Sequence, residues 1–225
     1  AERGDAICLL GRNAEDLERS AADLTARGNG SAVAWVPCDL EAPDGFAPAV
    51  AAAGDALEGL DTVVVTAGIF ATQDELESDP ELAEKLLRVD FTNTGLFCEA
   101  AKKALLAEGG GTLCVFSSVA GERGRKPVVI YGAAKAGLTR YLEGLDHKHS
   151  ADGLRVVTVK PGFVKTSMTA GLPPPPFAGE PDGVARQALR AIDRGTPVVY
   201  APSPWRLIMV VIRALPRAIM RKVGF

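Results

Sequence analysis

Cysteine is scarce in this sequence, and its spacing excludes the commonest metal and redox motifs. The 225 residues contain four cysteines and no C-x-x-C pair, so we expect neither a zinc site nor a dithiol redox centre. Three of the four (Cys8, Cys38 and Cys114) lie in or beside apolar, strand-like runs. The sequence therefore predicts buried, reduced thiols, as in a cytosolic protein.

Long apolar runs and a recognisable N-terminal signal peptide are also lacking. No run approaches the ~20 apolar residues of a membrane-spanning helix. A hydrophobic content of 47% over 225 residues fits one α/β domain with a sizeable core.

Acidic side chains are missing from the C-terminal stretch. Residues 203–225 hold five basic residues and no acidic one, so the net charge of −3 leaves −8 for the rest of the chain. Residues 1–202, with a net charge of −8, are too acidic to bind the phosphates of nucleic acid well. We expect no nucleic-acid binding.

The chemistry-bearing residues that are present gather between positions 112 and 135. An apolar run at 112–116 ends at two serines, the second being Ser118, and Tyr131 is followed four residues later by Lys135. Residues four apart share a helix face, so a helix beginning near Pro127 would place the Tyr131 hydroxyl beside the Lys135 ammonium. A tyrosine titrates near pH ~10, and a neighbouring cation lowers its pKa toward the range useful for proton transfer. The alternative is an ordinary amphipathic helix with an exposed Tyr and Lys.

With the Pro161-Gly162 turn after the next strand, this spacing resembles the short-chain dehydrogenase/reductase family over nearly the whole chain. The resemblance implies hydride transfer between a nicotinamide cofactor and a carbonyl or secondary alcohol. It implies that Tyr131 is the general acid/base, that Ser118 holds the substrate oxygen, and that Lys135 lowers the Tyr131 pKa and binds the nicotinamide ribose.

Short apolar runs alternate with helical patterns, which predicts an α/β fold with a doubly wound parallel sheet. The expected strands are residues 6–10, 32–36, 62–65, 112–116, 156–160 and 197–200. The expected helices are residues 14–28, 79–109, 127–149 and 182–194. We divide the chain into a Rossmann-like catalytic domain (1–202) and a basic amphipathic tail (203–225).

The sequence shows no strand and glycine-rich loop before residue 6. In a dinucleotide-binding fold the first strand, loop, helix and second strand form a unit of ~30 residues. The missing strand would lie between the strands at 6–10 and 62–65, and without it two inner sheet edges are open. We therefore expect roughly 20 further residues upstream in the natural protein.

The resemblance also implies a cofactor site. In this family a basic residue near the end of the second strand favours binding of NADP, through its 2′-phosphate, over NAD. Here Arg12 occupies that position and no acidic residue does, so we expect NADP, with NAD as the alternative. A solvated surface arginine is the other interpretation of Arg12. The remaining implied cofactor contacts are Asp39, Leu40, Thr66, Ala67, Gly68, Tyr131, Lys135, Pro161, Gly162, Val164 and Thr166.

One position departs from the family pattern. Where the family has a catalytic-site asparagine in a V-N-x-x-x pattern, this chain has Asp90, in V-D-F-T-N. An aspartate could hold a water beside Lys135 but would add negative charge there. Asn93, nearly one turn later, is an alternative for the role.

The tail allows two interpretations. Arg206, Arg213, Arg217 and Arg221 are 7, 4 and 4 residues apart, which predicts a helix with arginines along one side. Such a helix either contacts anionic headgroups at the inner face of the membrane or docks on its own body or on a second subunit. The ending also resembles that of decaprenylphosphoryl-ribose keto reductases, which act on a lipid-linked sugar.

The sequence thus predicts a cytoplasmic, homo-oligomeric oxidoreductase that acts on a small-molecule carbonyl or alcohol. Two other functions stay open. One is a catalytically weak NADP-binding regulator, and the other is a membrane-surface keto reductase for a lipid-linked substrate.

Overall fold

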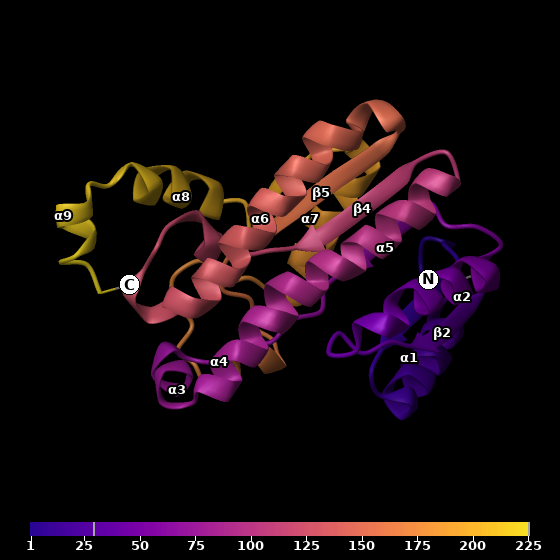
Figure 1. Ribbon diagram of the computed structural model, residues 1–225, viewed down its shortest axis with the longest axis horizontal. Helices are drawn as coiled ribbons and strands as arrows, with labels where there is room; N and C mark the ends of the chain where they lie inside the picture. The colour runs from indigo at the N-terminus through magenta and orange to yellow at the C-terminus, as the bar shows by residue number, and fades with distance from the viewer. Residues whose placement is uncertain (29, 225) are drawn as a thin grey trace.

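A computed structural model describes residues 1–28 and 30–224 and shows parallel strands covered by helices (Figure 1). The strands are β1 (Ile7–Gly11), β2 (Val33–Pro37), β3 (Thr62–Val65), β4 (Gly111–Phe116), β5 (Leu154–Pro161) and β6 (Val198–Ala201). The α-helices are α1 (Ala14–Arg27), α2 (Phe46–Leu57), α3 (Gln73–Ser78), α4 (Pro80–Leu87), α5 (Thr94–Ala107), α6 (Val129–His149), α7 (Pro181–Arg194), α8 (Trp205–Ala214) and α9 (Arg217–Met220).

All strand pairs are parallel, but they form two separate sheets. β1 pairs with β2, while β3, β4, β5 and β6 pair in that order. Helical crossovers between parallel strands confirm the expected α/β, doubly wound architecture. Among the described residues no strand lies between β1 and β3, and the additional upstream strand stays a prediction.

The sides of the larger sheet carry different helices. Leu113 and Val115 of β4 pack toward α5 and α6, whereas Cys114, between them, packs toward α7. This alternation follows from the two-residue period of a strand. It explains why the strands read as continuous apolar runs, because a sheet covered on both faces buries every side chain.

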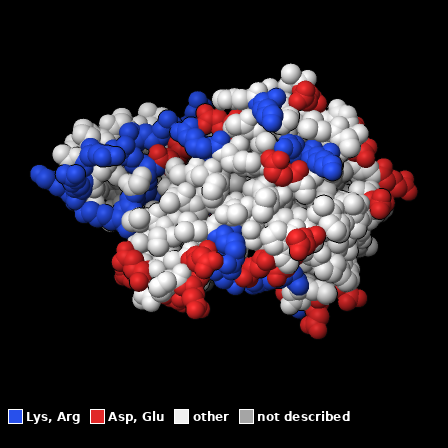
Figure 2. Space-filling model, viewed as in Figure 1, with Lys and Arg blue, Asp and Glu red and all other residues white. Residues whose placement is uncertain are grey.

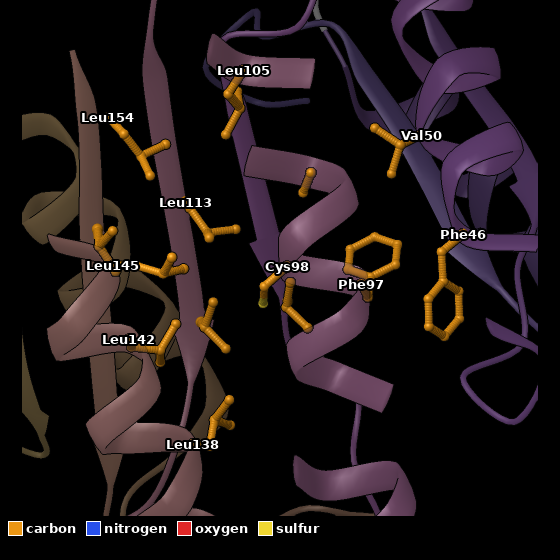
Figure 3. Packing of buried hydrophobic residues seen from close by; sticks show 14 residues of the cluster. Phe46, Val50, Phe97, Cys98, Leu105, Leu113, Leu138, Leu142, Leu145 and Leu154 are labelled. Atoms are coloured by element: carbon orange, nitrogen blue, oxygen red, sulfur yellow. The ribbon is translucent and has the colours of Figure 1, made fainter. Parts of the chain in front are cut away.

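The smaller sheet is joined to the larger one through packing of α2 on α5. Figure 3 shows Phe97 of α5 near Phe46 and Val50 of α2. The Phe46 and Phe97 rings meet edge to face, with centroids 5.6 Å apart and an interplanar angle of 79°, a geometry that aromatic pairs prefer. This contact holds β1 and β2 beside β3.

The long helix expected at 79–109 is interrupted. Asp79 caps its start by accepting a hydrogen bond from Leu82 N (3.0 Å), and Pro80 is its first residue. A π-helical segment, η2 (Arg88–Asn93), then separates α4 from α5. π-Helical turns are rare and often occur at functional sites, and this one buries Asp90 completely.

The tail forms two helices rather than the one continuous helix expected. α8 ends at Ala214 and α9 begins after Pro216, because proline has no N–H to continue a helical hydrogen-bond ladder. The four arginines therefore do not share one helix face.

α8 is docked on the body of the protein. Trp205, Met209 and Ile212 are buried and pack with Val119. Arg213 adds an ion pair, its Nη1 lying 3.3 Å from Glu122 Oε2. Across residues 1–28 and 30–224, no helix is long and apolar enough to cross a membrane.

The cysteines are free thiols that differ in burial. Cys98 and Cys114 are buried, as expected, whereas Cys8 and Cys38 are only partly buried. Burial raises the pKa of both Cys98 and Cys114 to about 12, so these two thiols are protonated at neutral pH.

Candidate active site

Two adjoining cavities lie at the carboxyl ends of the strands. The smaller has a volume of about 290 Å³ and is lined by residues that end β1, β2 and β3. The larger, of about 610 Å³, is lined by residues that follow β3, β4 and β5. Both include Thr66, Ala67 and Gly68 in their walls. The two cavities therefore adjoin at the turn after β3.

The three residues of the expected catalytic set all line the larger cavity. Ser118 comes directly after β4, and its Oγ accepts a hydrogen bond from Ala120 N (3.1 Å). Tyr131 and Lys135 lie one turn apart near the start of α6, with Lys135 Nζ 5.6 Å from the centroid of the Tyr131 ring. The structure thus brings together the residues that the spacing predicts.

Close backbone packing fixes α6 against β4 and the turn that follows it. A Cβ at Gly121 would lie 2.6 Å from the carbonyl carbon of Lys135, so only glycine allows this approach. The buried Ser117 hydroxyl donates to Lys135 O (3.0 Å) and lies 2.7 Å from Thr139 Oγ1. These contacts position Lys135 through its backbone.

Gln73 of α3 holds the start of α6, a role that the sequence did not reveal. Its Oε1 accepts hydrogen bonds from Val129 N (2.8 Å) and Ile130 N (3.2 Å). These are two of the N–H groups that a helix leaves unpaired at its beginning. Because no local pattern links residues 73 and 129, only the folded structure shows this cap.

Asp90 forms a buried ion pair with Lys135. Its Oδ2 lies 3.3 Å from Lys135 Nζ, and its Oδ1 accepts a hydrogen bond from Ile69 N (2.7 Å). Asp90 thus occupies the site beside the lysine that the alignment assigned to it. Asn93 does not take over this role, because its Nδ2 donates to Leu40 O at 2.5 Å.

The net shift of the Tyr131 pKa is opposite to the lowering expected from a neighbouring cation. The pKa of Tyr131 is raised above its ordinary value, chiefly by burial and then by the negative charge of Asp90, against which a hydrogen bond with Ser118 lowers it. Asp90 lies beside the lysine and opposes its charge. Burial also raises the pKa of Asp90, although Lys135 and the N–H of Ile69 lower it.

The residues expected to hold the cofactor divide between the two cavities. Arg12, Asp39 and Leu40 line the smaller one. The larger one is lined by Pro161, Gly162, Val164 and Thr166, together with Tyr131 and Lys135. The carboxyl ends of parallel strands are where α/β folds bind dinucleotides.

The turn after β3 lines both cavities beside the ion pair of Asp90 and Lys135. A Cβ at Gly68 would lie 3.2 Å from Asp90 Oδ1 and 3.4 Å from Lys135 Nζ, so glycine leaves room for this ion pair beside the turn. Within the described part of the chain, Asp90 Oδ2 has no partner other than the ammonium of Lys135, at 3.3 Å. The Tyr131 hydroxyl and the Lys135 ammonium in the larger cavity, with the smaller cavity adjoining it, fit a nicotinamide dinucleotide.

The outer wall of the larger cavity includes two residues that sequence reasoning missed. Trp205, at the start of α8, stacks so closely over Gly162 that a Cβ there would lie 2.1 Å from its Nε1. Arg125, from the connection before α6, also lines this cavity. Neither belongs to a recognisable motif, and both reach the cavity through tertiary structure.

Comparisons with known proteins agree with this geometry. A family model described as short chain dehydrogenase matches residues 1–175. An uncharacterized oxidoreductase of Mycobacterium tuberculosis is 34% identical, with 98% of this chain and 88% of the relative aligned. A cis-4-hydroxycyclohexanecarboxylate dehydrogenase of Sinomonas cyclohexanicum is 31% identical, with 77% and 69% aligned.

Among solved structures, a short-chain type dehydrogenase/reductase from Mycobacterium ulcerans has the same fold. It superposes with a TM-score of 0.78 at 23% identity, covering 87% of this chain and 78% of the other. The family match, the relatives above 30% identity and the arrangement of the two cavities lead to one conclusion. This chain belongs to the short-chain dehydrogenase/reductase family of NAD(P)-dependent oxidoreductases that act on CH–OH groups.

Proposed function

We propose that the chain transfers a hydride between NADP(H) and a carbonyl or secondary alcohol, with Tyr131 as the general acid/base. The observation that carries this proposal is the presence of Ser118, Tyr131 and Lys135 in the wall of one cavity. When bound, the nicotinamide supplies or accepts the hydride. The protein orients the reactants and moves the proton.

Each residue has a distinct part. The Ser118 hydroxyl donates a hydrogen bond to the substrate oxygen, and the Tyr131 hydroxyl gives that oxygen a proton during reduction. Lys135 binds the nicotinamide ribose, and its ion pair with Asp90 (3.3 Å) restricts where its ammonium can lie. Asp90 is a positioning residue in this scheme.

The raised pKa of Tyr131 suits a proton donor. Burial and the Asp90 carboxylate keep the phenol protonated at neutral pH, and a protonated phenol is a proton donor. In the oxidative direction the same group must first lose its proton, which alkaline pH promotes. We therefore propose that the Tyr131 phenol acts as the proton donor near neutrality and that alcohol oxidation is fastest at alkaline pH.

Arg12 supports NADP as the cofactor. It is exposed at the end of β1 and lines the smaller cavity, with Asp39 on the same wall. A guanidinium in this position can pair with a 2′-phosphate through two parallel hydrogen bonds. We assign the adenosine half of NADP to the smaller cavity and the nicotinamide half to the larger one.

The reaction can be tested with purified full-length protein. NADPH oxidation is followed with a panel of ketones and aldehydes, and the panel includes the ketone that corresponds to the alcohol named for the Sinomonas relative. Turnover of at least one carbonyl is expected. Tight NADPH binding without turnover of any carbonyl would instead favour a cofactor-binding regulator.

A second candidate function, at a membrane surface, rests on the outer face of the tail. On α8, Leu207 is 71% exposed and Val210 and Val211 are also exposed. Figure 2 shows basic side chains gathered at the end of the molecule where Figure 1 places α8 and α9. Apolar and basic groups together suit an interface with anionic headgroups, where a lipid-linked substrate would be reached.

Flotation with anionic liposomes tests the membrane contact. Leu207→Ser combined with Val211→Ser should abolish flotation while the NADPH-dependent activity on soluble carbonyls is kept, because both side chains point away from the body. Absence of flotation by the wild-type protein would leave α8 as a docked structural helix.

A further inference from the structure

Arg125 lines the larger cavity, and its charge has no partner among the residues that the structure describes. It lies on the connection between β4 and α6, just before the 3₁₀ turn η4 (Lys126–Val128). Its Nε is buried from solvent and has no hydrogen-bond partner in residues 1–28 and 30–224. No ion pair to its guanidinium is found within those residues either. The side chain as a whole is half-buried, and a buried polar atom such as this Nε normally has a hydrogen-bond partner.

The other charged side chains in this cavity neutralise one another. Among the described residues that line it, only Asp90, Arg125 and Lys135 carry charge. Asp90 and Lys135 form the 3.3 Å ion pair. The cavity therefore retains one uncompensated positive charge, that of Arg125.

The cavity that Arg125 lines is mainly apolar. Its walls include Phe70, Val119, Phe163, Met168, Leu172 and Trp205. Burial lowers the pKa of Arg125, but a guanidinium remains protonated in proteins. An apolar wall with one isolated cation suits a ligand that has an apolar body and one anionic group.

The backbone around Arg125 is fixed, so its side chain emerges from a defined position. Val128 N donates to Arg125 O (3.3 Å), and Gln73 holds the first N–H groups of α6 just beyond. Arg123, two residues earlier, donates through Nη2 to Leu215 O (2.8 Å). Arg123 is thus occupied in anchoring the tail, whereas Arg125 is available to a ligand.

We propose that Arg125 is a specificity-determining residue that binds the carboxylate of the substrate, so that the enzyme acts on keto acids or hydroxy acids with an apolar body. The inference rests on the proposed function, because it names the substrate class of that same site. The carboxylate accepts hydrogen bonds from the guanidinium, while the carbonyl or hydroxyl group lies at Ser118 and Tyr131. The two polar ends of the substrate are then recognised separately and its apolar body fills the space between them.

The test compares acids with their neutral esters. Levulinate, pinonate and dehydrocholate, each paired with its methyl ester, are assayed as carbonyl substrates with NADPH. The wild-type enzyme should prefer at least one acid to its ester by about tenfold to a hundredfold in kcat/KM, the range expected for a hydrogen-bonded charge. Equal kcat/KM for every acid and its ester would overturn the proposal.

Variants then assign the preference to Arg125. Arg125→Met, which keeps length and removes charge, should lose the preference for the acid while activity on the ester is kept. Arg125→Lys should retain part of it, because a lysine keeps the charge but not the fork of donors. Lys126→Met is the matched control, since Lys126 is exposed in the same connection and does not line the cavity, and it should leave the preference unchanged.

Two further outcomes separate this inference from the proposed function. If Arg125→Met raises the KM for NADPH and lowers activity on acid and ester alike, Arg125 serves the cofactor and the inference is wrong. If the wild-type protein reduces no carbonyl, the proposed function fails, and calorimetric titration with the same acids decides the inference alone. Binding of an acid that Arg125→Met weakens at least tenfold would support it; absence of binding by every acid would overturn it.

Discussion

The buried carboxylate of Asp90 lies 3.3 Å from the ammonium of Lys135, and neither side chain is more than 5% exposed. The charge of Lys135 is therefore not free to act on Tyr131 alone. Together with burial, Asp90 raises the pKa of Tyr131. The proton affinity of Tyr131 is thus raised by a carboxylate from η2 as well as by burial.

Replacing Asp90 by Asn should lower the pKa of Tyr131. Removal of a nearby negative charge favours the phenolate, so the alkaline pH at which alcohol oxidation reaches its half-maximal rate should decrease. Asn can still accept the hydrogen bond from Ile69 N, which protects the local fold. The measurement is the pH profile of kcat/KM for oxidation.

Glu81→Gln is the control for that experiment. Glu81 is an exposed carboxylate on α4, so its loss should leave the pH profile unchanged. An unchanged profile in Asp90→Asn itself would show that Asp90 does not influence the titration of Tyr131.

Arg12→Asp should shift the cofactor preference from NADP toward NAD. The change removes the partner of the 2′-phosphate and supplies a carboxylate that can bind a ribose 2′-hydroxyl. We expect the ratio of kcat/KM for NADPH to that for NADH to fall by at least about tenfold, the scale of one charged hydrogen bond. Arg19→Asp, on the exposed side of α1, is the matched control, and an unchanged ratio in Arg12→Asp would make Arg12 a surface residue.

Gln73→Leu should destabilise the protein and impair the site. The N–H groups of Val129 and Ile130 would lose their side-chain acceptor, and two such hydrogen bonds together contribute about 1–3 kcal/mol. Urea unfolding measures the loss of stability. Because Tyr131 lies just beyond this cap, kcat should fall more than the affinity for NADPH.

Glu77→Gln provides a comparison at the same contact. Glu77 Oε1 accepts from Gln73 Nε2 (2.8 Å) but does not touch α6. Its replacement should change the unfolding free energy by less than about 0.5 kcal/mol. If both variants lost the same unfolding free energy, Gln73 would stabilise α3 rather than the start of α6.

The sequence predicted the parts of the site that depend on short-range spacing. Ser118 follows an apolar strand, and Tyr131 and Lys135 share a helix face, so their positions can be read from local patterns. Asp90 was located through the family alignment. The strands were also predictable, because each is a short, continuous apolar run between helical segments.

The remaining features depend on contacts between distant parts of the chain. The cap that Gln73 provides, the packing of Trp205 on Gly162 and the isolation of Arg125 involve residues that no periodic pattern connects. The direction of the Tyr131 shift was missed because burial, which outweighs the other influences, cannot be read from a Y-x-x-x-K spacing. The break between α8 and α9 at Pro216 could have been predicted from the sequence, since proline interrupts a helix.

The central claim is that Tyr131 transfers the proton, and Tyr131→Phe tests it most directly. The substitution removes only the hydroxyl, so the fold and the affinity for NADPH, measured by thermal unfolding and by titration, should be kept. Carbonyl reduction should fall by at least about two orders of magnitude, the scale of lost general acid catalysis. Retention of more than about a tenth of the wild-type kcat would contradict the assignment of Tyr131 as the acid.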